Sequence, residues 1–122
     1  MSRIVVIEDS KLMRTMLCRV LEHAGHDVEV WEEVTAAEIP ERISAVDPDL
    51  IITDYQMPGC NGLTVARMAR RVRPELPVIV VTATHDPALT TALERVDVTH
   101  VLHKPLRGEE LVQAVHKALN QS

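Results

Sequence analysis

The chain has 122 residues, of which 46% are apolar and 25% are charged, and its formal net charge is −5. This length and composition correspond to one globular domain that forms a hydrophobic core without disulfide cross-links, and we expect a single domain over residues 1–122. The negative charge argues against direct binding to nucleic acid, and one Trp, one Tyr and no Phe argue against base stacking on aromatic side chains.

Apolar runs and amphipathic stretches alternate along the whole chain. Short runs rich in β-branched residues predict five strands, at 3–7, 27–31, 50–53, 78–82 and 98–102. Stretches with helical spacing of apolar residues predict five helices, at 10–24, 34–46, 62–72, 87–95 and 107–120. We expect Gly25 to end the first helix, Pro40 to shorten or distort the second, and Asp86-Pro87 to open the fourth.

Strict alternation with short connections predicts a parallel sheet that is covered by helices on both faces. The first, third and fourth strands are near-continuous apolar runs and belong in the buried centre, whereas the second, "DVEVW", alternates and belongs at an edge. The strand order 2-1-3-4-5 meets both conditions. We therefore predict an α/β fold of the (βα)5 type with a doubly wound, five-stranded parallel sheet, which is the flavodoxin-like arrangement.

Polar side chains stand where four of these strands end, with no other charge inside the apolar runs. They are Glu8 and Asp9 after the first strand, Asp54 after the third, Thr82 after the fourth and Lys104 after the fifth. Ligands of open parallel sheets bind at the carboxyl ends of the strands, so we expect these groups to share one site. Three carboxylates repel one another unless a cation lies among them, and oxygen ligands without His or Cys suit Mg²⁺.

The stretch "DYQMPGCNG" begins with Asp54 on a stiff apolar strand and continues with Pro58, Gly59 and Gly62. The strand fixes the carboxylate, and the Pro and Gly residues shape a loop whose backbone can approach a metal and then start a helix. A carboxylate in this setting is able to attack phosphorus and form an aspartyl phosphate, with a metal, Lys104 and Thr82 meeting the new negative oxygens.

Each of these residues, taken alone, also has an ordinary explanation. Asp9, which precedes Ser10, is compatible with a cap of the first helix, and Asp54 with an ordinary loop residue. Thr82 is common in strands and Lys104 on surfaces. The ordinary explanations require coincidence to bring all the polar groups to one end of the sheet, and the joint arrangement therefore favours a site.

The acidic pair Glu8-Asp9, the "DYQMPGCNG" stretch, Thr82-Ala83 and Lys104-Pro105 together resemble the receiver domain of two-component response regulators, over essentially the whole chain. The resemblance implies phosphorelay signal transduction. Asp54 would accept a phosphoryl group from the phosphohistidine of a sensor histidine kinase or a histidine phosphotransfer protein. The domain would then switch its binding to a downstream protein target, and it would have no separate turnover substrate.

The resemblance also implies how Mg²⁺ is held. Asp9 and Asp54 would be direct ligands, together with the backbone carbonyl of Gln56. Glu8 would act through a water molecule on the metal.

The phosphoryl group would be met by a second set of residues. Lys104 would pair with its oxygens, the Thr82 hydroxyl would turn toward them, and the Ala83 amide would donate to them. Gln56 and Thr84 match the variable positions that tune how fast water hydrolyses the acyl phosphate.

Two positions depart from the family pattern. Val101 stands three residues before the lysine, where the family usually has Tyr or Phe, and Asp97-Val98 replaces a small Gly-Ala step. Neither position is needed for accepting a phosphoryl group. Both bear on how the signal reaches the surface of the fourth helix, fifth strand and fifth helix, which is the expected contact with the target.

Two cysteines are too few for a disulfide framework and lack metal-ligand spacing. We expect Cys18 to be a small core residue and Cys60 to be exposed in its loop. Helical spacing places Arg67, Arg70 and Arg71 on one outer face, and this is either a solvated face or a docking patch for an acidic partner.

Six histidines are scattered along the chain, and we do not expect a zinc site. His103 adjoins Lys104, and His85 lies near the end of the fourth strand. A pH effect on hydrolysis of the acyl phosphate is therefore a further hypothesis.

The first residues show neither a signal peptide nor a membrane span, and we expect a cytoplasmic protein that is a monomer or a weak, phosphorylation-dependent dimer. The chain stops after the fifth predicted helix. It is either a stand-alone receiver or a fragment of a longer regulator with a DNA-binding or enzymatic output.

Three other functions are compatible with parts of this pattern. A flavodoxin-type flavin carrier needs a Gly-rich or hydroxyl-rich phosphate loop and aromatic residues around the flavin. A small phosphatase with an aspartyl nucleophile needs a second acid where this chain has Gln56. A degenerate receiver binds partners without phosphorylation, and the intact set of polar residues argues against it.

Overall fold

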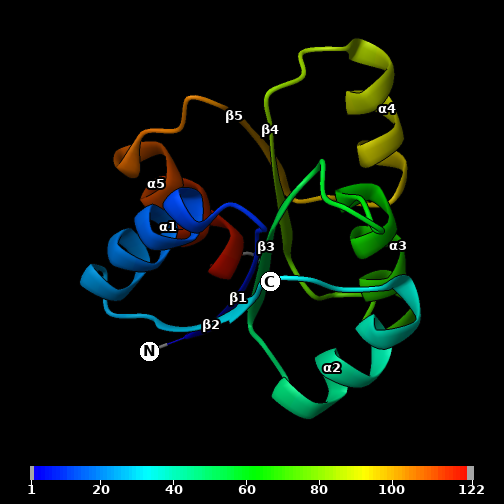
Figure 1. Ribbon diagram of the computed structural model, residues 1–122, viewed down its shortest axis with the longest axis horizontal. Coiled ribbons are helices and arrows are strands. Elements are labelled where there is room, and N and C mark those ends of the chain that lie inside the picture. The colour runs from blue at the N-terminus through cyan, green and yellow to red at the C-terminus, as the bar shows by residue number, and fades with distance from the viewer. Residues whose placement is uncertain (1, 121–122) are drawn as a thin grey trace.

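The structure is a computed structural model that describes residues 2–120. Five parallel strands form one sheet in the order β2-β1-β3-β4-β5 (Figure 1). The strands are β1 (Arg3–Ile7), β2 (Asp27–Trp31), β3 (Leu50–Asp54), β4 (Val78–Thr82) and β5 (His100–His103). The predicted α/β class and strand order are confirmed.

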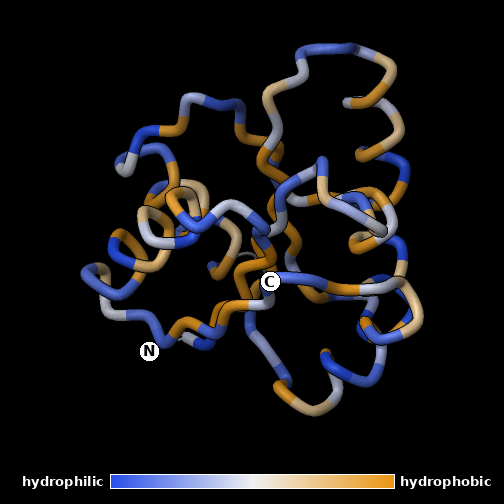
Figure 2. Tube along the Cα trace, in the orientation of Figure 1, coloured by the Kyte–Doolittle hydropathy of each residue, from blue (hydrophilic) through white to orange (hydrophobic). Residues whose placement is uncertain are grey.

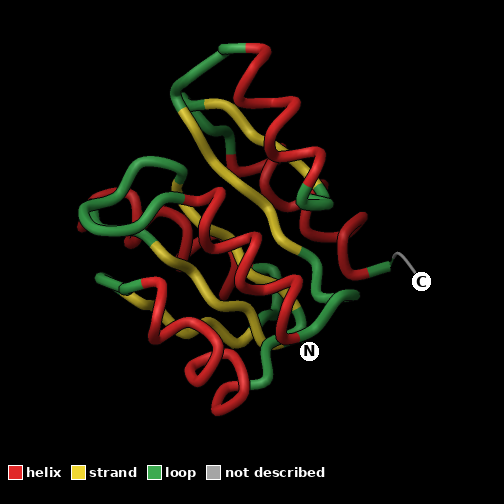
Figure 3. The backbone as a smooth tube through the Cα atoms, turned by 90° about the vertical axis from the view of Figure 1, so that its right-hand side faces the viewer, coloured by secondary structure: helices red, strands yellow, loops and turns green. Residues whose placement is uncertain are grey.

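Helices cover both faces of the sheet. They are α1 (Lys11–His23), α2 (Ile39–Val46), α3 (Gly62–Val72), α4 (Pro87–Arg95) and α5 (Gly108–Leu119), with a short 3-10 helix, η1 (Ala36–Glu38), before α2. α1 and α5 lie on one face, and α2, α3 and α4 lie on the other, which is the side that faces the viewer in Figure 3. The domain is therefore doubly wound, as the alternation of strands and helices predicts.

The hydrophobic core consists of two layers, one on each face of the sheet. Along β1, Val5 and Ile7 point into the layer under α2, α3 and α4, whereas Ile4 and Val6 point into the layer under α1 and α5. The central strands are buried on both sides, and the hydropathy colouring of Figure 2 shows them as a continuous apolar centre. Because both faces are packed, the strands form a rigid support for whatever stands at their ends.

The second helix is shortened at its start, where Pro40 lies. The predicted helix over 34–46 is split into η1 and α2, and Pro40 lies in the first turn of α2. A helix needs no internal hydrogen bond from its first amide groups, so proline is tolerated there and excluded from the interior. The expectation that Pro40 shortens this helix is confirmed.

The fifth strand begins two residues later than predicted. Asp97 adopts a left-handed conformation with φ of 57°, and the Val98 amide donates to the Leu93 carbonyl at 3.2 Å. These contacts close the end of α4, so Asp97 and Val98 belong to a helix terminus rather than to the strand. The apolar pattern that begins at Val98 gives no sign of this.

Local signals placed the other helix ends well. Ser10 caps α1, and Gly25 follows its end with φ of 94°. Asp86 caps α4 by accepting a hydrogen bond from the Ala88 amide at 2.9 Å, as predicted. Asn61 caps α3 through the Thr64 amide at 2.9 Å.

The exposure predicted for Cys60 is wrong. Its side chain is 8% exposed and packs in the layer under α2, α3 and α4, because the loop after β3 folds back and the Gly62 amide donates to the Tyr55 carbonyl at 2.8 Å. Cys18 is half-buried on α1.

The three arginines of α3 do not behave alike. Arg67 and Arg71 are exposed. Arg70 is half-buried, and its guanidinium group donates to the carbonyls of Val96 at 3.3 Å and Pro74 at 2.6 Å, and also to that of Leu76. Arg70 therefore ties the end of α3 to the segments that follow α3 and α4, and it is not part of a solvated face. Among residues 2–120, no helix is both long enough and apolar enough to cross a membrane.

Candidate functional site

Three carboxylates meet at the carboxyl ends of β1 and β3. Glu8 and Asp9 follow β1, and Asp54 is the last residue of β3, the strand that pairs with β1. One carboxylate oxygen from each of the three lies within 4.8 Å of the others. The register of two neighbouring strands thus produces the acidic cluster that the sequence predicted, and this cluster is able to hold a metal ion.

Lys104 places an ammonium group against the cluster. Its Nζ lies 3.3 Å from Oδ1 of Asp54 and 3.8 Å from Oε1 of Glu8. The Lys104 amide also donates to the Thr82 carbonyl at 2.9 Å, which anchors the backbone beyond β5 to the end of β4. One ammonium group faces three carboxylates, so the site retains a negative charge that favours a divalent cation.

Glu8 is the most strongly perturbed acid of the cluster. It is 1% exposed. The pKa of Glu8 is raised to about 7, chiefly by burial and also by Asp54 and Asp9, while the hydrogen bond from the Ser10 amide and the charge of Lys104 act in the opposite direction. Near neutral pH Glu8 therefore shares its carboxylate with a proton, and a cation bound among the three acids would displace that proton.

Asp9 is not the cap of α1. Ser10 performs that role, since its Oγ accepts a hydrogen bond from the Met13 amide at 3.4 Å. The guanidinium group of Arg14 donates to the Glu8 carbonyl at 3.1 Å and to the Asp9 carbonyl at 2.8 Å. The ordinary explanation of Asp9 is thereby removed, and Arg14 emerges as a residue that positions the acidic loop, a role that sequence reasoning missed.

The loop after Asp54 is shaped by a close backbone approach at Gly62. A Cβ atom at this position would lie 3.0 Å from the Asp54 carbonyl oxygen and 3.0 Å from the Tyr55 Cα. A side chain here would force these backbone atoms apart by a few tenths of an ångström, so glycine allows the start of α3 to pack tightly against the end of β3. Asp54, which is 8% exposed, is held by a rigid strand on one side and by this contact on the other.

Thr82 ends β4 and is 3% exposed. Its hydroxyl oxygen accepts a hydrogen bond from the Thr84 amide at 3.1 Å. Of the remaining predicted residues, Ala83 is exposed and Thr84 half-buried in the loop after β4, and Gln56 is exposed in the loop after β3. The structure thus places Gln56 beside Asp54 in the chain, and Ala83 and Thr84 directly after Thr82.

Two histidines form a contact that sequence reasoning did not predict. The rings of His85 and His103 are stacked, with centroids 4.3 Å apart and an angle of 9° between the planes. The sequence placed each near a strand end, but their pairing depends on the path of the loop after β4. His103 immediately precedes Lys104.

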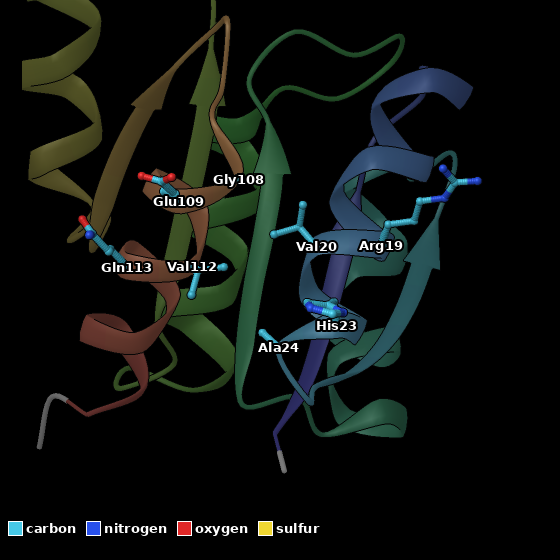
Figure 4. Close-up of a pocket in the computed structure, with 8 residues that line it drawn as sticks. All are labelled: Arg19, Val20, His23, Ala24, Gly108, Glu109, Val112 and Gln113. Atoms are coloured by element: carbon cyan, nitrogen blue, oxygen red, sulfur yellow. The ribbon is translucent and has the colours of Figure 1, made fainter.

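A separate hollow of about 790 Å³ lies between α1 and α5, away from the acids. Figure 4 shows Val20 of α1 and Val112 of α5 on its two sides. It is lined by Arg19, Val20, His23, Ala24, Gly108, Glu109, Val112 and Gln113. This lining offers no cluster of ligating groups, so we assign the site by its chemistry and not by the size of the hollow.

Comparison with known proteins identifies relatives for nearly the whole chain. The family model of the response regulator receiver domain matches residues 4–116. The chain is 32% identical over 119 residues to the response regulator receiver protein CpdR of Brucella abortus, with 98% of each chain covered. It is 34% identical over 121 residues to the DNA-binding transcriptional regulator NtrC of Azospirillum brasilense. That match covers 98% of this chain but only 24% of the relative.

Solved structures agree with this. A putative response regulator from Chloroflexus aurantiacus is 27% identical, with a TM-score of 0.87 and 98% of each chain covered. The chain spans less than a third of the length of several longer relatives that it matches.

Proposed function

The chain belongs to the receiver domains of response regulators, a family that takes part in phosphorelay signalling, and we propose that Asp54 is its phosphoacceptor. The observation that supports this assignment best is the 3.3 Å contact between Lys104 Nζ and Oδ1 of Asp54 within a cluster of three acids. Receivers work with histidine kinases and with downstream targets, and the donor here would be the phosphohistidine of a sensor kinase or of a histidine phosphotransfer protein.

The chemistry requires one bond to form and one to break. A carboxylate oxygen of Asp54 forms a bond to phosphorus while the bond between phosphorus and the histidine nitrogen breaks, and that nitrogen keeps the electron pair. Lys104 offsets the negative charge on the phosphoryl oxygens. The Thr82 hydroxyl leaves the Thr84 amide and donates to one of these oxygens, and the Ala83 amide donates to another.

We assign Mg²⁺ to the acidic cluster, with Asp9, Asp54 and the Gln56 carbonyl as ligands and Glu8 acting through a water. The donor set fits, because it consists of oxygens and because the buried Glu8 carries a proton that a cation would replace. When bound, Mg²⁺ supplies positive charge that neutralises the transferred phosphoryl group.

The acyl phosphate would then be hydrolysed by water at a rate tuned by Gln56 and Thr84, so the domain resets itself without a turnover substrate. The downstream target would bind the surface of α4, β5 and α5. The change between the two states is a population shift, which needs only a few kcal/mol.

Labelling with a small phosphodonor tests the assignment. Incubation with acetyl phosphate and Mg²⁺ should add the mass of one acid-labile phosphoryl group to the wild type and none to Asp54→Asn. Asp27→Asn is the matched control, because Asp27 is an exposed aspartate at the start of β2, and it should label like the wild type. Equal labelling of wild type and Asp54→Asn would refute the assignment.

Thr82→Ala separates acceptance from switching. This variant should still be labelled, since the attacking group and Lys104 are unchanged, but the surface of α4, β5 and α5 should no longer respond. Loss of labelling itself would contradict the role proposed for Thr82.

A specific observation also favours a second possibility, a fragment of a longer response regulator with a DNA-binding or enzymatic output. The chain covers 24% of NtrC from Azospirillum brasilense but 98% of CpdR from Brucella abortus. The size of the native protein, measured by immunoblot of the source cells, would decide between a receiver of this length and a longer regulator.

A further inference from the structure

We propose that the stacked rings of His85 and His103 are the positioning contact through which the phosphoryl state of Asp54 is transmitted from the end of β4 to β5. This inference rests on the proposed function and adds to it the route by which the signal leaves the site.

The two rings join the chain segments that carry Thr82 and Lys104. His85 lies three residues after Thr82, and His103 immediately precedes Lys104. In the register of β4 and β5, Thr82 and His103 are direct neighbours. The stack, with ring centroids 4.3 Å apart, therefore connects the loop after β4 to β5 beside the two groups that would meet the phosphoryl oxygens.

The stack lies on the α4 side of the sheet. Val101 packs against the layer under α2, α3 and α4, whereas Leu102 packs against the layer under α1 and α5. Side chains alternate along a strand, so His103 faces the same side as Val101. Val101 is β-branched and short, with restricted rotation, and it lacks the aromatic ring that the family usually has at this position. His103 supplies an aromatic ring on the same side.

A movement of Thr82 has a direct path to the stack. The Thr82 hydroxyl accepts a hydrogen bond from the Thr84 amide at 3.1 Å. If that hydroxyl turns to a phosphoryl oxygen, the Thr84 amide loses this partner, and the backbone that leads into His85 is released from the contact that fixes it to Thr82. On the other side, the hydrogen bond from the Lys104 amide to the Thr82 carbonyl, at 2.9 Å, holds the backbone of β5 in place. A displacement of the loop after β4 therefore changes the contact between the rings of His85 and His103.

Amide chemical shifts on addition of Mg²⁺ and beryllofluoride, which mimics an acyl phosphate, test the route. In the wild type we expect shifts both at 84–86 and at 100–103. In His103→Ala the shifts at 84–86 should persist, while the shift induced at Val101 should fall severalfold. His103→Phe keeps a flat ring and should restore the response at Val101, which a role in general stability alone would not explain.

His100→Ala is the matched control. His100 lies on the same strand, but it borders a hollow beside α5 and so faces the opposite side from His103. Its replacement should leave the response at Val101 close to that of the wild type. An equal loss in His100→Ala and His103→Ala would mean general loosening of β5, and it would overturn the specific role of the stack.

The single and double variants of the pair give a further check. If the rings act as one contact, His85→Ala should reduce the response of β5 as much as His103→Ala, and the double variant should reduce it no further. A full response of β5 in His103→Ala would overturn this inference alone. Absence of any response to beryllofluoride in the wild type would overturn the phosphoacceptor assignment and the inference together.

Discussion

The buried carboxylate of Glu8 gives a quantitative prediction for stability. Burial raises its pKa from the usual 4.5 to about 7, and the side chain is 1% exposed. Between these two values Glu8 binds more protons in the folded protein than in the unfolded chain, so its contribution to stability is largest below pH 4.5 and is lost as the pH rises through 7. At about 1.4 kcal/mol for each tenfold change in protonation, ionised Glu8 costs at most roughly 3 kcal/mol.

Glu8→Gln removes this cost while keeping nearly the same shape. Urea unfolding in the presence of EDTA measures the free energy of unfolding of both proteins. The difference in favour of the variant should grow by up to about 3 kcal/mol from acidic to mildly alkaline pH. Exposed Glu22 on α1 provides the control, and Glu22→Gln should show no such dependence on pH.

Mg²⁺ should reverse the comparison. A cation among the three acids favours ionised Glu8, so Mg²⁺ should stabilise the wild type more than Glu8→Gln at mildly alkaline pH, and its apparent affinity for the wild type should weaken below pH 7. A stability difference between wild type and Glu8→Gln that stays constant across pH would refute the reasoning, because it would mean that Glu8 does not titrate in this range.

Three further predictions follow from packing. Gly62→Ala should lower the free energy of unfolding by about 1–3 kcal/mol and slow phosphoryl labelling of Asp54, because the new Cβ would lie 3.0 Å from backbone atoms; unchanged urea unfolding would show that the backbone yields. Arg70→Lys should lower the free energy of unfolding by about 2 kcal/mol, because several hydrogen bonds to carbonyls are lost. Exposed Arg71→Lys should change it by less than about 0.5 kcal/mol, and equal effects of the two variants would contradict the structural role of Arg70. Cys60 should react with iodoacetamide mainly after unfolding, since it is 8% exposed and burial raises its pKa, and rapid alkylation of the native protein would disprove its burial.

The two ends of α4 show what can be predicted from residue types that lie close together in the sequence. Asp86 followed by proline predicted the start of α4 correctly, because a cap and its amide partner are within two residues of each other. The end of the same helix, at Arg95, was also predicted correctly, but the start of β5 was placed two residues too early. Asp97, just before the predicted strand, takes up a left-handed conformation that Asp adopts more readily than most residues, but the apolar pattern that begins at Val98 gave the stronger signal.

The acidic residues of the candidate site were predictable from the sequence, but the residue that positions their loop was not. The placement of Asp54 and Glu8 at the ends of neighbouring strands follows from the strand order, since parallel strands end at the same edge. The contribution of Arg14 was not predictable, because its guanidinium group acts on the carbonyls of Glu8 and Asp9 through the path of the helix, and those carbonyls carry no sequence signal.

The sequence by itself determined the order of strands and helices, the buried centre of the sheet and the edge at which the acids gather. These features depend on the periodicity of apolar side chains and on the alternation of elements, both of which are read along the chain. Only the tertiary structure decided that Cys60 is buried and that His85 stacks on His103. Such contacts depend on how loops fold back over the sheet, and that path is set by packing between segments distant in sequence.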